Sequence, residues 1–453
     1  AGTEVAAITW IALGIVLAAV LQMVVRSASR LLILGASRRI VFDIRKRFFR
    51  QLQRLSASFY DSRRTGDLMS RGINDLQLIR SLYGPAMMNA LNTTIAYVAT
   101  VTILLNIHVR LTLISFAIYP VLLYCVRRVS RIVYGRSREV QEQLSELSSR
   151  AQENISGISQ VRIYAQEDRE IRSFREACVE YRRRNLRMTA LRGAMMALIG
   201  MFSGIGTLIV LYAGGREVVG GSLSLGDFVA FNTYLALLTW PTVAMGWIVN
   251  VFQRGIGAMD RVDEILGAEP DIPPPVDEGE DGDAVDGDIV IRDLSFRYAG
   301  DGESEVRPSL RKVNLTISKG SRIALVGTVG SGKSTLANLL ARVYPVPRDA
   351  ITIGGVDIND IPVGSLRRSI GYVPQEAFLF SRTLEENIRL GRPSASDEEV
   401  LRAVEIANLT GDVDSFPAGL DTVVGERGFT VSGGQRQRLT LARAAVTDPN
   451  ILI

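Results

Sequence analysis

The stretch that decides the fold of the second half of the chain is Gly327-Thr328-Val329-Gly330-Ser331-Gly332-Lys333-Ser334. It has the spacing Gly-x4-Gly-Lys-Ser and lies between an apolar run at 322–326, which predicts a strand, and a segment at 334–343, which predicts a helix. This strand, loop and helix context identifies a P-loop. Its backbone N–H groups can surround phosphate oxygens, Lys333 can reach the β and γ phosphates, and Ser334 can hold Mg²⁺.

The sequence around this loop alternates strand and helix patterns. Further strands are predicted at 289–296 and 370–373, and further helices at 398–407 and 435–445. Such alternation favours a mostly parallel sheet with its ligand at the carboxyl ends of the strands. We therefore predict an α/β P-loop nucleotide-binding domain at 289–453.

The first half of the chain is apolar in blocks. Five stretches contain no charged residue, at 5–25, 81–109, 111–126, 193–215 and 228–253. A helix of 21 residues is about 31 Å long, enough to cross a hydrocarbon layer of roughly 30 Å. We expect an α-helical transmembrane bundle with five spans at 1–267, and kinks at Pro120 and Pro241. Only 22% of the residues are charged and 47% are hydrophobic, which excludes a disordered chain.

Basic residues give the orientation of these spans. The segments 26–80 and 127–192 hold 13 and 15 Lys and Arg, whereas Arg110 and Arg216 stand alone in the short connections. The long segments therefore face the cytoplasm, and topology rather than nucleic-acid binding explains their charge. Their helical composition predicts spanning helices that continue below the membrane and reverse around 58–66 and 154–159. With the nucleotide domain cytoplasmic, five spans imply a sixth that precedes them.

A linker is predicted at 268–288, where nine acidic residues and four prolines occur without a basic residue. Other chemistries lack raw material. With His108 as the only histidine, neither a His-ligated metal site nor a Ser/His/Asp triad is expected, and Cys125 and Cys178 do not make a disulfide framework.

A second anion site is suggested by Val431-Ser432-Gly433-Gly434-Gln435, which opens a predicted helix. By itself this pattern is equally typical of an N-capped helix after a flexible turn. Together with the P-loop it resembles the ATP-binding cassette (ABC) family, whose signature sequence is LSGGQ. Val431 replaces the first leucine, a packing change that leaves the phosphate donors in place.

The resemblance implies a set of ligands for ATP and Mg²⁺. Tyr298 matches the aromatic residue that stacks on adenine, and Gln375 matches the glutamine that touches Mg²⁺ and the attacking water. Lys333 and Gln375 are the catalytic residues expected in this sequence, with Ser334 and Gln375 at the metal. The complete set expected to bind the nucleotide is Tyr298, Gly327, Thr328, Val329, Gly330, Ser331, Gly332, Lys333, Ser334, Thr335, Ser432, Gly433, Gly434 and Gln435.

The resemblance is to exporters of this family. Residues 422–428 are similar to an exporter segment that contacts the intracellular helices, and the reversals at 61–66 and 155–160 would be coupling helices. A half-transporter of the cell membrane is implied, working as a homodimer or heterodimer in which one chain's signature meets the other's P-loop. Its cargo would be a hydrophobic or amphiphilic drug or lipid. The expected candidates for lining the cargo path are Asn89, Asn92, Asn232 and Tyr234.

The sequence departs from the family pattern at its end. It stops at Ile451-Leu452-Ile453, the kind of strand that in this family leads into the Walker B aspartate and the catalytic carboxylate. We therefore expect the nucleotide domain to continue beyond Ile453. Two alternatives share every motif found here, an ATP-gated channel or regulatory subunit, and a catalytically degenerate member of a heterodimer.

Overall fold

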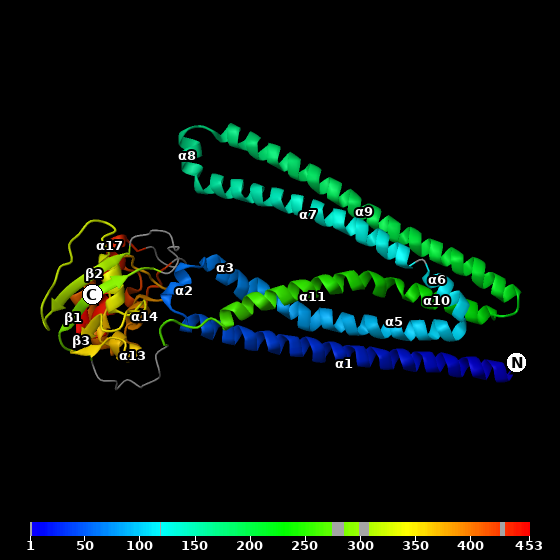
Figure 1. Ribbon diagram of the computed structural model, residues 1–453, viewed down its shortest axis with the longest axis horizontal. Coiled ribbons are helices and arrows are strands. Elements are labelled where there is room, and N and C mark those ends of the chain that lie inside the picture. The colour runs from blue at the N-terminus through cyan, green and yellow to red at the C-terminus, as the bar shows by residue number, and fades with distance from the viewer. Residues whose placement is uncertain (1, 118, 274–284, 299–307, 426–430) are drawn as a thin grey trace. The chain divides into compact units, whose positions relative to one another are not determined.

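The structure is a computed structural model that describes residues 2–117, 119–273, 285–298, 308–425 and 431–453 (Figure 1). The chain divides into two compact units, which are described one after the other. The first unit comprises residues 1–35 and 81–254, and the second comprises residues 36–80 and 255–453.

Long helices make up the first unit. Helices α1 (Gly2–Arg54) and α9 (Glu167–Val219) each run for 53 residues without interruption. At ~1.5 Å per residue each is about 80 Å long, so both extend well beyond a membrane, as the sequence predicts. The other helices that contribute to this unit are α5 (Met87–Ile107), α6 (Val109–Phe116), α7 (Tyr119–Ser156), α8 (Ile158–Ile163), α10 (Leu225–Leu237) and α11 (Thr239–Leu266).

Three described helical stretches are long and apolar enough to cross a membrane: Thr9–Arg54, Thr65–Ile107 and Glu167–Val219. They correspond to the first, second and fourth predicted spans. The spans predicted at 111–126 and 228–253 are each divided between two helices, α6 and α7 in one case and α10 and α11 in the other. Pro120 and Pro241 stand near the starts of α7 and α11, where proline lacks the N–H needed to continue a preceding helix. The structure thus has a helix break before each proline rather than the predicted kink within one helix.

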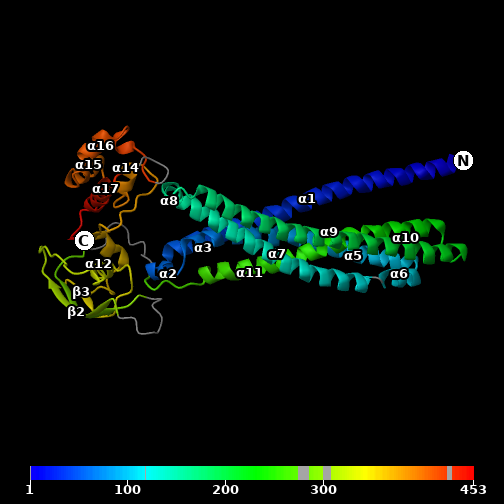
Figure 2. The same ribbon diagram turned by 90° about the horizontal axis from the view of Figure 1, so that it is seen from above.

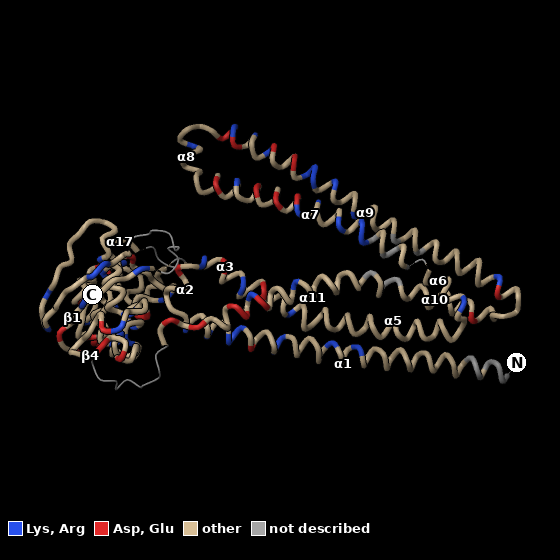
Figure 3. The backbone as a smooth tube through the Cα atoms, in the orientation of Figure 1, with Lys and Arg blue, Asp and Glu red and all other residues tan. Residues whose placement is uncertain are grey.

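Charge separates the two ends of these helices. Helix α5 has no charged residue, whereas the halves of α7 and α9 nearest α8 carry many (Figure 3). The short helix α8 lies at the reversal predicted around 154–159. A charged helical hairpin that ends in a sharp turn agrees with the cytoplasmic extension expected from the sequence.

The core of the first unit brings α5, α6, α9 and α10 together. Phe231 is completely buried there. Gly214 of α9 lies against Phe228 of α10, because a Cβ atom on Gly214 would approach the ring of Phe228 to 2.8 Å. Glycine therefore permits the close approach of α9 and α10. The buried members of this cluster are Leu104, Leu111, Val210, Leu223, Phe231, Leu235 and Leu238.

Short helices follow α1 at the reversal predicted around 58–66. They are α2 (Ala57–Asp61), α3 (Thr65–Ser70) and α4 (Leu76–Ser81), with π-helical turns η1 (Arg71–Asp75) before α4 and η2 (Leu82–Ala86) after it. The turn η2 contains Pro85, whose carbonyl accepts a hydrogen bond of 2.8 Å from the Asn89 side chain. Neither π turn is predicted by the local sequence pattern.

Ion pairs fasten this segment to α11 within the second unit. The Arg261 guanidinium donates to both carboxylate oxygens of Asp75, at 2.9 and 2.6 Å. Arg63 and Arg71 both donate to Glu264, at 2.9 and 2.7 Å. The two-pronged pairing of Arg261 with a largely buried carboxylate is the strongest geometry among these contacts.

The nucleotide half of the second unit holds two sheets. Strands β1 (Ile289–Phe296), β2 (Leu310–Ile317), β3 (Ile351–Ile353) and β4 (Val356–Asp357) form an antiparallel sheet in the order β2-β1-β3-β4. Strands β5 (Ile370–Gly371) and β6 (Ile451–Leu452) pair in parallel. The prediction of a mostly parallel sheet is therefore wrong for the larger sheet. Gly354 and Gly355, with φ of +57° and +84°, form a two-residue turn that reverses the chain between β3 and β4.

The strand predicted at 322–326 is also not found, because no ladder reaches these residues in the part of the chain that the structure describes. Their side chains are exposed, Val326 to 94%. A central parallel strand needs hydrogen-bonded neighbours and covered faces, and this segment has neither here.

The nucleotide half is divided into two lobes, each with its own hydrophobic core (Figure 2). The sheet lobe contains the antiparallel sheet, α12 (Lys333–Leu340) and α13 (Val363–Arg368). The helical lobe contains α14 (Leu384–Arg389), α15 (Asp397–Ile406), α16 (Thr410–Ser415), the 3₁₀ turn η3 (Gly419–Asp421) and α17 (Gly433–Ala445). The predicted helices at 334–343, 398–407 and 435–445 correspond to α12, α15 and α17.

The start of the predicted linker contacts α1 and α2, although its composition suggests a solvated segment. The Ala268 carbonyl accepts from the Gln51 side chain, and Asp271 accepts from Ser58. Ile272 is buried, with 6% of its surface exposed. Residues 274–284, which hold five of the nine acids, lie outside the described part.

We predict that Asp75→Ala lowers the free energy of unfolding by about 2 kcal/mol, because it leaves Arg261 without its carboxylate partner. Thermal unfolding of the purified protein in detergent measures this loss. Glu142→Ala is the matched control, since it removes an exposed pair with Arg138 and is expected to cost less than about 0.5 kcal/mol. Equal melting temperatures for the two variants would contradict the role given to Asp75.

Candidate functional site

The P-loop owes its shape to three glycines. Gly330 and Gly332 have φ of +82° and +87°, in the left-handed region where other residues are strained. A Cβ atom on Gly332 would lie 2.6 Å from both the Ser309 carbonyl oxygen and a methyl group of Leu310. A Cβ atom on Gly327 would lie 2.6 Å from Ser331 Oγ. The loop therefore packs closely on itself and on the start of β2, with α12 beginning directly after it.

Lys333 folds back over this loop. Its Nζ donates to the carbonyl oxygens of Gly327 and Thr328, both at 2.8 Å, and lies 3.3 Å from Ser331 Oγ. These partners are uncharged, so they orient the ammonium group without neutralising it. An anion within the loop would gain the full positive charge of Lys333 together with the amino end of α12.

The next two residues of α12 point to different surroundings. Ser334 is exposed in the first turn of the helix, and its hydroxyl is the hard oxygen ligand that Mg²⁺ prefers. Thr335 is 7% exposed, and its Oγ1 accepts a hydrogen bond of 3.0 Å from the Tyr298 hydroxyl. The structure thus brings the aromatic residue predicted for adenine within one hydrogen bond of the P-loop helix.

Arg367 of α13 holds the opposite end of the P-loop helix. It donates to the carbonyl oxygen of Arg342 at 2.8 Å, just after α12 ends. Burial lowers the pKa of the Arg367 guanidinium from its ordinary value, which still leaves it charged at neutral pH. A cation at this end complements the helix dipole and satisfies carbonyls that the helix leaves free. Sequence reasoning missed Arg367, because only the folded chain brings α13 to this helix end.

The predicted signature segment forms a helix start of its own. Ser432 caps α17 in a capping box, in which its Oγ accepts from the Gln435 backbone and the Gln435 side chain accepts from the Ser432 backbone. Ser432, Gly433 and Gly434 are exposed, whereas Val431 is buried in the core of the helical lobe. Both readings of this pattern are compatible with that geometry, since an N-capped helix start is also an anion site.

Asp412 of α16 braces this helix start, and sequence reasoning missed it. It accepts from the Gln435 side chain at 3.1 Å and from two nitrogens of Arg438 at 2.9 and 2.6 Å. Partial burial alone would raise the pKa of Asp412, but the hydrogen bonds from Arg438 and Gln435 outweigh it and lower that pKa. The Gln435 side chain is therefore occupied within the lobe, which leaves the O–H group of Ser432 and the backbone amides of Gly433 and Gly434 to meet a ligand.

The two candidate anion sites belong to different lobes. The P-loop precedes α12 in the sheet lobe, and Ser432 precedes α17 in the helical lobe (Figure 2). Gln375 is exposed in the segment that follows β5. Of the exporter-like segment at 422–428, residues 426–428 lie outside the described part of the chain.

In the membrane half, the four polar residues predicted to line a cargo path differ in surroundings. Asn89 of α5 donates to the carbonyl of Pro85 in the preceding turn η2, and Tyr234 packs against the core of the first unit. Asn92 and Asn232 are exposed. Among the contacts of the described residues, only Asn92 and Asn232 have neither a hydrogen bond nor a place in the core.

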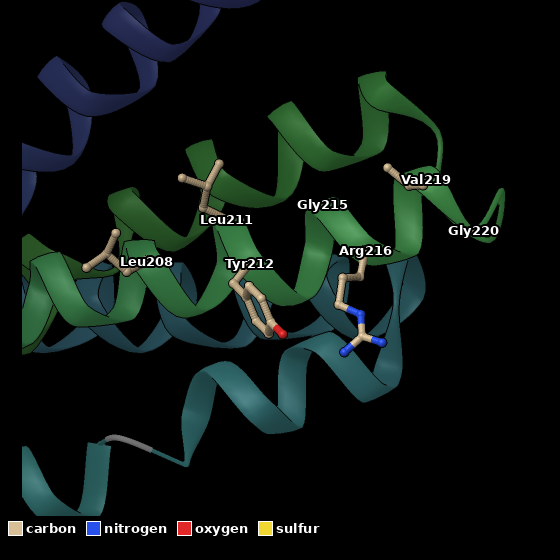
Figure 4. A pocket seen from close by; sticks show the side chains of 7 residues that line it. All are labelled: Leu208, Leu211, Tyr212, Gly215, Arg216, Val219 and Gly220. Carbon is tan, nitrogen blue, oxygen red and sulfur yellow. The ribbon is translucent and has the colours of Figure 1, made fainter.

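A hollow of about 750 Å³ follows one face of α9 and was not foreseen (Figure 4). It is mostly apolar, and the Arg216 guanidinium lies 5.9 Å from the centre of the Tyr212 ring. The residues that line it are Leu208, Leu211, Tyr212, Gly215, Arg216, Val219 and Gly220. An apolar wall with one cation suits an amphiphilic molecule better than a small ion.

Comparison with known proteins agrees with both halves. A family model described as the ABC transporter transmembrane region matches residues 1–242, and one described as ABC transporter matches residues 310–453. A probable multidrug resistance ABC transporter ATP-binding/permease protein of Bacillus subtilis is 35% identical over 412 residues, which are 90% of this chain and 69% of that protein. A putative multidrug export ATP-binding/permease protein of Staphylococcus aureus is 36% identical over 421 residues, which are 92% of this chain and 71% of that protein.

These matches agree with the P-loop at the start of α12 and with the long apolar helices of the first unit. The chain belongs to the ABC transporter family, as a multi-pass membrane region joined to an ATP-binding domain that is an ATPase.

Proposed function

We propose that this chain is one half of a dimeric exporter that uses ATP to move hydrophobic or amphiphilic compounds out of the cytoplasm or the inner leaflet. The observation that carries the proposal is the division of the two anion sites between separate lobes, each with an exposed helix start. A triphosphate that contacts both kinds of site is then held between two chains, one giving the P-loop and the other giving Ser432.

The chain's own residues would divide the work at this interface. Backbone amides of the P-loop and the Lys333 ammonium would neutralise the phosphate oxygens, and Tyr298 would stack on the adenine. Ser334 and Gln375 would hold Mg²⁺, which supplies further positive charge at the phosphates. Gln375 would also orient the attacking water. These roles are inferred from residue type, motif and position.

Closure follows from unequal binding. ATP that touches two chains binds the closed dimer more tightly than the open one, and a ligand shifts an equilibrium only through such a difference. Hydrolysis removes the shared group and releases the two chains. The helices α2 and α8, at the two cytoplasmic reversals, would carry the movement as coupling helices.

The nature of the cargo is inferred from the membrane half and from the relatives, which are named for multidrug export. The hollow along α9 is apolar with a single cation, which favours an amphiphile. A drug or a lipid would satisfy this chemistry.

The test is transport by the full-length protein in liposomes. ATP-dependent accumulation of a fluorescent amphiphilic dye against its gradient supports export. A passive ion current opened by ATP, without accumulation, would instead identify an ATP-gated channel. If ATP is hydrolysed only when a second, different half-transporter is mixed with this one, the exporter is a heterodimer.

Replacing the P-loop lysine gives the first prediction about this function. Lys333→Ala is expected to reduce ATP-driven dye accumulation to background, because the phosphates lose their main cation. Accumulation and ATP hydrolysis are measured on the same vesicles. Lys312→Ala, at an exposed lysine of β2, is the matched control and is expected to retain both. Full transport by the Lys333→Ala homodimer would refute the assignment.

Tyr298 provides the second prediction. Tyr298→Ala is expected to raise the KM for ATP by about 10-fold, since stacking of a base on an aromatic ring contributes ~1–3 kcal/mol. Tyr298→Phe keeps the ring and loses only the bond to Thr335, so its KM should stay much closer to wild type. Steady-state ATPase measurements over a range of ATP concentrations separate the two. An unchanged KM for the alanine variant would exclude adenine stacking.

Asp412 provides the third prediction. Asp412→Ala is expected to lower the kcat for ATP about 10-fold with little change in ATP affinity, because the signature helix meets ATP only in the closed dimer. Glu405→Ala, at an exposed acid of α15 in the same lobe, is the control. A large loss of ATP affinity with a normal kcat would contradict the proposal that α17 meets ATP only in the closed dimer.

A further inference from the structure

Tyr344 lies directly beside Tyr298, the residue whose ring is proposed to stack on adenine. It follows the last residue of α12 by four positions and is 9% exposed, within the core of the sheet lobe. Its ring meets the Tyr298 ring edge to face, with centroids 5.0 Å apart and an angle of 89°. It also packs at a tilt on Phe296, at 5.8 Å. The orientation of Tyr298 therefore depends on where the Tyr344 ring lies.

The hydroxyl of Tyr344 reaches out of this core to α2. It donates a hydrogen bond of 2.8 Å to Oδ2 of Asp61, the last residue of that helix. A buried phenol needs a partner for its O–H group, and a carboxylate acceptor makes the bond a charge-assisted one. One side chain thus touches both α2 and the candidate adenine ring, and all these residues belong to the same compact unit.

The direction of this bond is fixed. Burial, and after it the hydrogen bond to Asp61, raises the pKa of the Tyr344 phenol above its ordinary value. The phenol keeps its proton throughout the physiological range, so Tyr344 is the donor and the Asp61 carboxylate is the acceptor.

Other contacts of α2 do not duplicate this connection. Ala57 packs on the core of the sheet lobe, but as a methyl group it has no preferred direction. The Tyr60 hydroxyl donates to the carbonyl of Leu52 in α1, and among the described residues it has no hydrogen bond to the sheet lobe. Ser58 donates to Asp271, at the start of the linker. Among the described residues, Tyr344 is the side chain through which a hydrogen bond joins α2 to the neighbourhood of the P-loop.

We propose that Tyr344 is a positioning residue that couples the orientation of α2 to nucleotide binding through the Tyr298 ring. The proposal rests on the function proposed above, in which Tyr298 stacks on adenine. If α2 moves, the Tyr344 hydroxyl either loses a partner that it cannot replace in the core or carries its ring along and shifts Tyr298. By linkage, a nucleotide that selects one position of Tyr298 selects the matching position of Asp61.

The experiment compares variants of the full-length protein in liposomes, with ATP hydrolysis and dye accumulation measured together. Tyr344→Phe keeps the ring and removes the hydroxyl. It is expected to reduce the dye accumulated per ATP hydrolysed by at least about 5-fold, the lower end of typical couplings between sites. Asp61→Ala should produce the same loss. Asp61→Asn keeps an acceptor oxygen and should restore most of the ratio.

The matched control is Tyr60→Phe, which removes a phenol hydroxyl from the same helix, but one whose hydrogen bond goes to Leu52 of α1. Its ratio should equal that of the wild type. The double variant Tyr344→Phe with Asp61→Ala should lose no more than either single variant, because both remove the same bond. A general structural defect would lower dye accumulation and hydrolysis together and leave their ratio unchanged.

A wild-type ratio in Tyr344→Phe, or losses that add in the double variant, would overturn the proposal. Should Tyr344→Phe fail to fold, Asp61→Ala gives the same test with the sequence of the nucleotide domain intact. A wild-type protein without ATP-driven accumulation would overturn the proposed function and this inference together. Normal export by the wild type and by Tyr344→Phe would overturn only the inference.

Discussion

The close approach of Gly332 to the start of β2 is the constraint on which the sheet lobe depends. No side chain fits between them, since even a Cβ atom would lie 2.6 Å from two atoms of residues 309 and 310. This contact sets where α12 begins, and Arg367 fixes where it ends. Tyr298 can then reach Thr335 in the first turn, and Tyr344 emerges just beyond the last turn. The phosphate cradle, the aromatic cluster and the contact with α2 are thus consequences of one tightly packed helix.

Local patterns were enough to predict the parts of the molecule in which chemistry follows spacing. The P-loop, the Ser432 cap and the helices α12, α15 and α17 depend on residues within a few positions of each other. The two cytoplasmic reversals were also visible, because helical periodicity stops there. By contrast, Arg367, Asp412 and Tyr344 act on partners that lie 25, 26 and 283 positions away. No pattern in a single sequence marks such pairs.

The antiparallel sheet and the divided membrane helices differ from the sequence predictions for specific reasons. The Gly354-Gly355 pair between short apolar segments was a hairpin signal that the strand and helix alternation hid, so the larger sheet was expected to be parallel. In the membrane half, absence of charge was a sufficient guide to apolar blocks but not to helix continuity. Pro120 and Pro241 divide two of these blocks, which shows that backbone hydrogen bonding sets helix boundaries even where hydropathy is uniform.

The two π turns around α4 bear on how this part of the chain can vary in length. A π turn holds one residue more than the α-helical turn it replaces, so η1 and η2 act as single-residue insertions that the helix has absorbed. Deletion of one residue from either would restore regular α-helical geometry and leave the residues beyond it in nearly the same orientation, whereas a deletion elsewhere in the helix would rotate them by about 100°. Chains that are one residue shorter here would therefore keep the same face of α5 toward its neighbours, and sequence alignments across 71–86 should place their gaps within these turns.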